Sequence, residues 1–195
     1  MEVRLVLSLT KRSIDDQRDV DGYYVATASG DNVHKEKAII LLTEVYGHTF
    51  INSQLIADQF AENGYTTYIP DLFFGDAFPQ PPNRFEGGDV FTWLNGAHNK
   101  TKSPHDAANT DPSVLKAIKH LREDLGFKKV GAAAYCFGAK YTVRHLDGEK
   151  GFDVGYAAHP SFVEKEELEN IKGPLSISAA GGYYLSEFHP TRNVQ

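Results

Sequence analysis

One cysteine stands in a sequence context that suits a nucleophile. Cys136 is the single cysteine of the 195-residue chain, and it follows a short apolar run that ends at Tyr135. Ala134 and Gly138 lie two positions before and after it, the small-x-nucleophile-x-small spacing of a nucleophile elbow. In an elbow, a tight strand-to-helix turn lifts the nucleophile clear of the sheet, and the start of the following helix favours a thiolate. The spacing predicts nucleophilic catalysis by Cys136; the alternative is a buried structural cysteine.

The composition excludes several other classes of protein. The net charge is −6 and no basic stripe is present, which argues against a nucleic-acid partner. A single cysteine cannot form an internal disulfide, so no oxidising compartment is required. No apolar run approaches the roughly 18 residues of a transmembrane helix, and the first ten residues alternate like a strand rather than a signal peptide. We therefore expect a cytoplasmic protein without membrane or nucleic-acid partners.

The elements that must position Cys136 alternate between strands and helices. The run 38–42 is apolar on both faces, as a central strand of a helix-covered parallel sheet requires. Further strands are expected at 1–10, 23–27, 65–69, 152–158 and 174–180, and in the run before Cys136. Helices are expected from a cap at Asn52 or Ser53 to Asn63, around 91–97, from the pair Asp111-Pro112 to near Gly126, from the elbow to Gly148, and at 164–170.

This alternation predicts a single three-layer α/β domain with a mostly parallel sheet over residues 23–180. An N-terminal strand or arm (1–22) precedes it, and a tail (181–195) follows it. The irregular stretch from Phe74 to Asn109 predicts a lid or binding loop. Its aromatic residues either line a pocket or pack the lid on the domain: Phe85, Phe91 and Trp93. Three histidines lack metal-ligand spacing and are expected at the surface, without metal or cofactor: His98, His105 and His120.

Four segments in the same order resemble the dienelactone hydrolase family, especially its fungal branch: 43–47, 68–73, 135–141 and 159–162. The resemblance covers roughly Tyr23 to Ala180. It implies an α/β-hydrolase fold and a Cys-His-Asp triad that acts on a small ester or lactone. By position, Cys136 matches the nucleophile, and Glu44 matches a glutamate beside the resting thiol. The backbone N–H groups of Val45 and Phe137 match the oxyanion hole.

The C-terminal part departs from this pattern. Where the triad aspartate is expected the chain reads Gly181-Gly182-Tyr183-Tyr184, and it stops at Gln195, before the expected position of the triad histidine. We therefore expect a divergent or truncated C-terminus that lacks the last strand and helix. The exposed sheet edge that results predicts a homodimer or low solubility. His159 is either a pocket residue that could act as base or a structural histidine, and His189 is either a surrogate base or a solvated tail residue.

Three functional hypotheses remain open from the sequence. The first is a cysteine-dependent hydrolase of a small ester or lactone that works through an acyl-enzyme and is impaired by the missing triad members. The second is an inactive family member that binds a small molecule or a protein partner. The third is an oxidant-sensing thiol, against which Glu44 argues because a neighbouring carboxylate opposes ionisation of the thiol.

Overall fold

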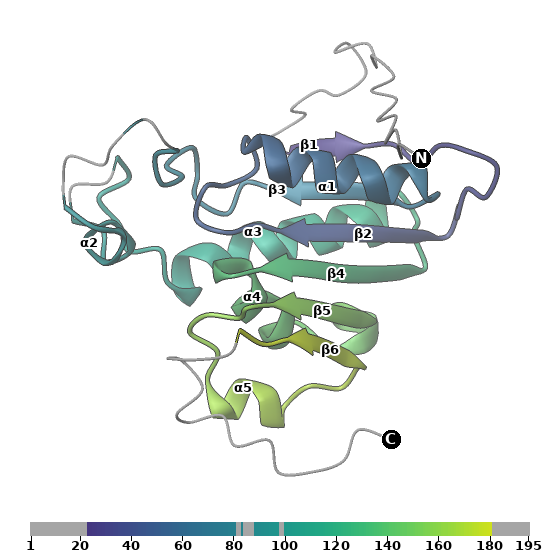
Figure 1. The fold of residues 1–195 in the computed structure, drawn as a ribbon. Helices are drawn as coiled ribbons and strands as arrows, with labels where there is room; N and C mark the ends of the chain where they lie inside the picture. The colour runs from purple at the N-terminus through teal and green to yellow at the C-terminus, as the bar shows by residue number, and fades with distance from the viewer. Residues whose placement is uncertain (1–22, 81–82, 84–87, 98–99, 181–195) are drawn as a thin grey trace, which may run out of the picture.

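A computed structural model describes residues 23–80, 83, 88–97 and 100–180 of the chain. Six strands form one sheet in the order β1-β3-β2-β4-β5-β6 (Figure 1). The strands are β1 (Tyr23–Ala26), β2 (Lys37–Leu42), β3 (Thr66–Pro70), β4 (Lys129–Tyr135), β5 (Val154–Ala158) and β6 (Leu175–Ser178). β1 runs antiparallel to β3, and every other neighbouring pair is parallel. The predicted mostly parallel sheet is confirmed.

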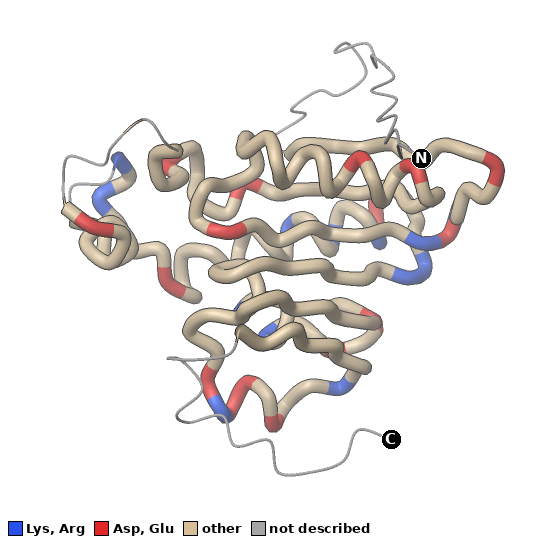
Figure 2. Tube along the Cα trace, viewed as in Figure 1, with Lys and Arg blue, Asp and Glu red and all other residues tan. Residues whose placement is uncertain are grey.

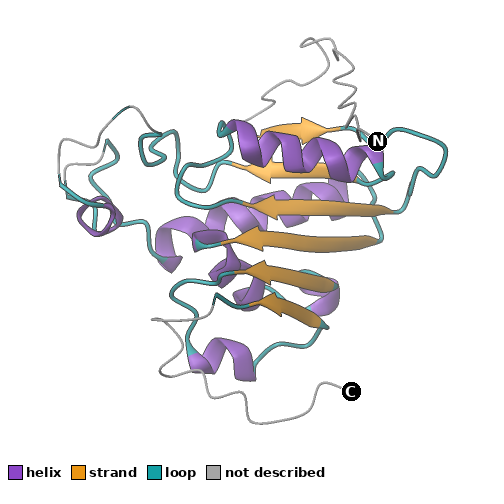
Figure 3. Cartoon of the chain, in the orientation of Figure 1, coloured by secondary structure: helices purple, strands orange, loops and turns teal. Residues whose placement is uncertain are grey.

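Helices cover both faces of this sheet (Figure 3). They are α1 (Ile51–Glu62), α2 (Val90–Leu94), α3 (Ala107–Lys119), α4 (Phe137–Arg144) and α5 (Lys165–Glu169), with a π-helical turn at His120–Asp124 and a 3-10 turn at Gly148–Lys150. α1 packs on one face, against β1, β3 and β2, whereas α3 and α4 lie on the other. α2 lies beyond the carboxyl ends of the parallel strands (Figure 1). The three-layer architecture predicted from the alternation of elements is therefore confirmed.

Side chains of the central strands alternate between the two faces of the sheet, and a hydrophobic core lies on each face. Ile40 and Leu42 of β2 point into the cluster under α3 and α4, whereas Leu41 points into the cluster under α1. In β4, Ala132 and Ala134 join the first cluster and Ala133 the second. Successive side chains of a strand point to opposite faces, so only a strand apolar at every position can be buried on both.

The expected start of the first helix is wrong by two or three residues. α1 begins at Ile51 after Phe50, so Asn52 and Ser53 lie inside its first turn instead of capping it. Ser53 is buried there. The expected stop is correct: Gly64 follows the helix with φ +88°, a left-handed conformation that only glycine adopts without strain.

The start of α3 also differs from the prediction. Asp106, not Asp111, is the N-cap, and its side chain accepts a hydrogen bond of 3.1 Å from the backbone N–H of Asn109. Pro112 consequently lies within the helix rather than at its first position. Asp111 does not cap the helix. Its carboxylate instead hydrogen-bonds to Arg144, the last residue of α4, and to His145, which follows α4. Both Asp106 and Asp111 are of a residue type that can cap a helix. In the folded chain Asp106 is the cap, and Asp111 contacts Arg144 and His145.

The stretch from Phe74 to Asn109 is anchored by a buried polar cluster. His105 Nε2 lies 3.5 Å from Asp76 Oδ2, and both side chains are almost fully buried. Trp93 donates its indole N–H to the Asp76 carbonyl (2.9 Å), and its ring packs in a tilted arrangement against the His105 ring. The expectation that His105 lies at the surface is therefore wrong, because Asp76 provides a partner inside. Trp93 packs in the core, whereas Phe85 and His98 lie outside the described residues.

Charged residues occur at both ends of the sheet (Figure 2). At the amino-terminal ends of the parallel strands, Asp153 accepts hydrogen bonds from Lys129 and Arg122, at 2.8 and 2.7 Å.

Within the described part of the chain, β6 pairs with β5 alone. No helix in that part is long and apolar enough to cross a membrane. The predicted strand 1–10, the tail 181–195 and His189 lie outside the described residues. The predicted homodimer stays a prediction.

Candidate active site

Three of the predicted site residues follow neighbouring strands of the sheet. Glu44 comes two residues after β2, Cys136 directly after β4 and His159 directly after β5. The strands are parallel and adjacent, with Leu42 opposite Ala134 and Tyr135 opposite Ala158. Parallel strands end at the same edge of the sheet, so the fold brings these three residues to one edge, where open α/β sheets collect their binding sites.

Cys136 occupies a strained turn between β4 and α4. Its backbone has φ 51° and ψ −113°, a conformation that costs free energy for any residue with a Cβ. The end of β5 and the loop after β2 hold this turn: the Cys136 N–H donates to the Ala158 carbonyl (3.0 Å), and the Gly138 N–H donates to the Thr43 carbonyl (3.0 Å). The strand–turn–helix context predicted for an elbow is therefore present, and Cys136 is partly exposed rather than buried.

The thiol faces a cavity of about 340 Å³. Its wall is mostly apolar and comes from the loop after β2, the stretch around α2, the start of α4 and the loop after β5. The lining residues are Val45, Tyr46, Phe78, Val90, Phe91, Leu94, Cys136, Phe137, Ser161 and Phe162. Four of these residues belong to the stretch from Phe74 to Asn109, whose role as a lid or binding loop stays a prediction. A mostly apolar wall with few polar groups suits a small organic ligand.

The two residues predicted for the oxyanion hole both line this cavity. Phe137 is the first residue of α4, and Val45 lies in the loop after β2. The Val45 carbonyl accepts a hydrogen bond of 2.8 Å from the Phe78 N–H, which ties that loop to the stretch before α2. Neither the Val45 N–H nor the Phe137 N–H donates to another described residue. The role of these two N–H groups as an oxyanion hole stays a prediction.

Ser161 is a site residue that the sequence reasoning missed. Its Oγ lies 3.4 Å from Cys136 Sγ, and its backbone N–H donates to the Cys136 carbonyl (3.2 Å). Among the described side chains, Ser161 is the polar group that contacts the thiol, and no imidazole does. The available signal was its position just after β5, at the same sheet edge. A hydroxyl that follows a buried strand is too common a pattern to single out.

Glu44 and His159 interact electrostatically at this edge. Burial raises the pKa of the half-buried Glu44 carboxyl above its ordinary value, and the charge of His159 opposes the rise. His159 is itself exposed, has φ 38° and donates its backbone N–H to the Ser178 carbonyl (2.8 Å). Neither side chain hydrogen-bonds to the Cys136 thiol. The structure therefore brings Glu44, Cys136 and His159 to one edge without joining them into a bonded triad.

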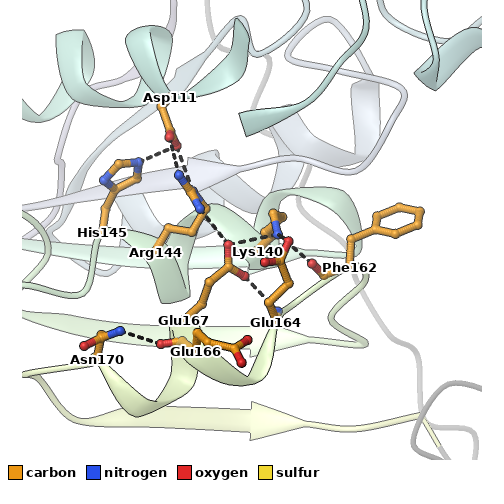
Figure 4. Close-up of polar contacts among 9 residues, drawn as sticks. All are labelled: Asp111, Lys140, Arg144, His145, Phe162, Glu164, Glu166, Glu167 and Asn170. Atoms are coloured by element: carbon orange, nitrogen blue, oxygen red, sulfur yellow. Dashed lines mark hydrogen bonds and ion pairs between the residues drawn. The ribbon is translucent and has the colours of Figure 1, made fainter. Parts of the chain in front are cut away.

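An ion-pair network holds the loop after β5 against α4 (Figure 4). Lys140 of α4 donates to the Phe162 carbonyl (2.8 Å) and pairs with Glu164 and Glu167. Arg144 pairs with Glu167 and with Asp111 of α3. Burial raises the pKa of the Asp111 carboxyl, but the hydrogen bonds from Arg144 and from His145 lower it further than burial raises it, so the net shift is downward. The network joins α3, α4 and α5 behind the cavity.

The described residues contain no group of three or more His, Cys, Asp or Glu side chains that could hold a metal ion. His120, one of the histidines expected at the surface, is partly exposed and lies 2.9 Å from Asp124 on the same helical turn.

We expect Glu44→Gln to stabilise the protein at neutral pH. A carboxyl whose pKa is raised by folding binds more protons in the folded state, so its ionisation lowers stability as the pH rises from the unfolded pKa toward the folded pKa. Glutamine carries no such charge. The free energy of unfolding of the variant should therefore exceed that of the wild type at pH 7, and the gap should shrink toward about pH 4.

Urea denaturation across this pH range measures the effect. Glu166→Gln, which changes an exposed glutamate of α5, serves as the control and should alter stability little. A wild type as stable as Glu44→Gln at pH 7 would contradict the expected penalty for a buried charge at this position.

Comparisons with known proteins identify the group to which this architecture belongs. The model of the dienelactone hydrolase family matches residues 21–183. The chain belongs to the dienelactone hydrolase family. The chain is 44% identical over 164 residues to the hydrolase tropI of Talaromyces stipitatus, and this match covers 84% of the chain and 62% of the relative. It is 30% identical over 142 residues to the human carboxymethylenebutenolidase homolog, covering 71% of the chain and 52% of that protein.

The family's fold is also found among solved structures. A candidate dienelactone hydrolase from Klebsiella pneumoniae superposes with a TM-score of 0.53 at 13% identity, covering 88% of the chain and 85% of that protein. At this identity the likeness concerns the fold alone. The α/β-hydrolase-type fold implied by the resemblance is therefore confirmed. The chain spans between half and two thirds of the length of the two dienelactone hydrolase family relatives described above.

Proposed function

We propose that the protein hydrolyses a small carboxylic ester or lactone and that Cys136 is its nucleophile. The observation that carries the proposal is the backbone of Cys136, whose φ of 51° and ψ of −113° place the side chain at a strand-to-helix turn facing the cavity. Strain of this kind persists where surrounding contacts hold it, and such positions cluster at active sites. Here the contacts come from the loops after β2 and β5.

The reaction has two steps. The Cys136 thiol gives up its proton, the thiolate attacks the carbonyl carbon, the acyl C–O bond breaks, and the alcohol leaves with the proton that the thiol lost, so that a thioester remains on Cys136. Water then attacks the thioester carbonyl, releasing the carboxylic acid and restoring the thiol. In a lactone the alcohol and acid remain in one molecule. The backbone N–H groups of Val45 and Phe137 are proposed to stabilise the oxyanion in both steps.

The acid–base partner of Cys136 is proposed to be weak. Among the described residues no imidazole contacts the thiol, and the polar side chain that does so is Ser161, whose Oγ lies 3.4 Å from Cys136 Sγ. We propose His159 or His189 as a surrogate base, and we propose that Glu44 restrains the resting thiol by like-charge repulsion. Turnover should then be slow, about 10³-fold below that of a complete triad.

The names of the relatives support the substrate class. The human relative is named as a homologue of a carboxymethylenebutenolidase, and a butenolide is a lactone. The Talaromyces relative is named a hydrolase. The mostly apolar wall of the 340 Å³ cavity fits the hydrocarbon part of a small ester or lactone.

Burst kinetics with 4-nitrophenyl acetate test the proposal. The wild type should release one equivalent of nitrophenolate quickly and then turn over slowly, because acylation needs only the nucleophile and the oxyanion hole. Cys136→Ala should abolish both phases, and Cys136→Ser should retain at most a trace of either. Loss of the slow phase alone in His159→Ala or in His189→Ala would identify the surrogate base.

The second candidate function is that of a family member that binds a small molecule without turnover, and two observations favour it: the mostly apolar wall of the cavity and the contact of the thiol with the Ser161 hydroxyl at 3.4 Å. The same assay separates the two functions. If the wild type gives neither a burst nor steady turnover, the hydrolase proposal is wrong and the binding function takes its place.

A further inference from the structure

A second cavity of about 480 Å³ adjoins the one that contains the thiol. The two share four wall residues, which are Phe91, Leu94, Phe137 and Phe162. We propose that the cavities form one bipartite substrate site, with the reacting carbonyl at Cys136 and a second, uncharged aromatic or apolar arm of the substrate in the second cavity. This inference rests on the proposed hydrolase function and names its substrate class more closely.

The second cavity follows one face of α4 away from the nucleophile. Phe137, Lys140 and Tyr141 line it, and their spacing of three and four residues places them on the same side of the helix. A helix rises about 1.5 Å per residue, so this wall runs about 6 Å along α4 from the residue next to Cys136. One aromatic ring on a short linker spans that length. The opposite wall comes from α2 and from the start of α3, including Asn95 and Ala108.

Two exposed aromatic rings stand where the cavities meet. The Phe91 ring is on α2 and the Phe162 ring is on the loop after β5, with centroids 6.5 Å apart and planes at 87°. The two residues are 50% and 52% exposed. Covering a large apolar side chain with a ligand removes apolar surface from water, which favours binding. Two rings packed edge to face present both a face and an edge to a third ring. An aromatic arm that passes between the cavities would bury apolar surface of both.

The backbone of Phe162, whose ring lines both cavities, is held in place without a ligand. Phe162 has φ 60°, which is strained for a bulky residue, and its carbonyl accepts a hydrogen bond from Lys140. Figure 4 shows the Phe162 ring pointing away from this carbonyl contact. The backbone is therefore fixed by α4 while the ring remains on the cavity wall. A wall that is already positioned costs less conformational entropy on binding.

The charges around the second cavity favour an uncharged arm. Lys140 is the cation on the described part of the wall, and it is already paired with two glutamates and a carbonyl. Asp106 and Glu164 place carboxylates on the wall, which oppose an anionic group. Burial lowers the pKa of His105 despite the opposing charge of Asp76, so its imidazole supplies no compensating charge at neutral pH. A hydrocarbon or aryl group meets none of these penalties.

Substrate selectivity tests the inference. We expect the wild type to have a higher kcat/KM for 4-nitrophenyl 3-phenylpropanoate than for 4-nitrophenyl acetate. Ala108→Phe and Asn95→Phe fill the second cavity from two different elements, and neither residue lines the cavity that contains the thiol. Each should lower the ratio of the two kcat/KM values at least tenfold, mainly through KM for the longer ester. Leu115→Phe is the control, because Leu115 is exposed on α3 and lines neither cavity; its ratio should equal that of the wild type.

A binding measurement separates this inference from the hydrolase function. The uncharged ketone 4-phenylbutan-2-one cannot be hydrolysed, and calorimetry should give a dissociation constant at least tenfold weaker for the cavity-filling variants than for the wild type. If the ketone behaves in this way but no ester is turned over, the hydrolase proposal fails and the second cavity stands as a binding site. If folded variants leave both ketone binding and ester selectivity unchanged, the bipartite site is wrong. Tighter binding of the carboxylate analogue, 4-(3-oxobutyl)benzoate, would overturn the uncharged arm.

Discussion

Gly138→Ala is expected to destabilise the protein by about 3 kcal/mol or more and to displace the turn at Cys136. A Cβ at this position would approach the Leu42 carbonyl carbon to 2.5 Å and the carbonyl oxygen still more closely. These are backbone atoms of Leu42, a fully buried residue of β2 that pairs with Ala134 of β4, so they cannot rotate away as a side chain would. The close approach of α4 to β2 therefore requires glycine at this point.

Gly131→Ala is the matched control, because it adds the same methyl group to the strand that leads into the elbow. Its Cβ would meet the Val154 side chain at 3.3 Å, and Val154 is exposed and able to move. Urea denaturation should give this control a stability within about 1 kcal/mol of the wild type. The variant Gly138→Ala should also lose the burst with 4-nitrophenyl acetate in any fraction that remains folded. Equal stability of the two variants would refute the steric argument.

The second large effect is expected at Lys140. Its side chain is 11% exposed, and its Nζ lies 2.8 Å from Glu167 Oε1 and 2.8 Å from the Phe162 carbonyl. Lys140→Met keeps the length of the side chain but leaves the Glu167 carboxylate, itself 8% exposed, without one of its two cations. Removing one partner of a buried ion pair costs about 3–5 kcal/mol, and we expect about 3 kcal/mol because Arg144 still binds Glu167.

Lys165→Met provides the comparison on α5. Lys165 pairs with Glu169 at 3.4 Å, but the two side chains are 81% and 61% exposed. Its replacement should change the free energy of unfolding by about 0.5 kcal/mol or less, because exposed pairs are screened by water. Chemical denaturation of both variants at neutral pH measures the difference. If the two losses are equal, burial of the Lys140 pair does not contribute as argued.

The elbow could be predicted from the sequence because its determinants are local. A small residue on each side of Cys136, an apolar run before it and a helical pattern after it all lie within about fifteen residues. The structure bears out that context, with β4 ending at Tyr135 and α4 beginning at Phe137. The central strand β2 could also be predicted from the sequence, because a short run that is apolar at every position is typical of a strand buried on both faces.

The contacts made across the sheet could not be predicted in this way. Ser161 lies 3.4 Å from the thiol although 25 residues separate them, and nothing near Ser161 distinguishes it from other serines. The burial of His105 depends on Asp76, which lies at the other end of an irregular stretch without periodicity. The start of α3 was misplaced for a related reason: the carboxylate of Asp111 is bound by Arg144, more than thirty residues away.

The sequence by itself determined the alternating α/β order, the elbow at Cys136 and the resemblance to the family, because these depend on residue types at short and regular spacing. Only the tertiary structure decided which groups meet at the elbow. Neighbouring parallel strands bring Glu44, Cys136 and His159 to one edge, Ser161 rather than an imidazole contacts the thiol, and Lys140 fixes the wall at Phe162. Those contacts depend on strand order and helix packing, which a single sequence does not encode at any fixed separation.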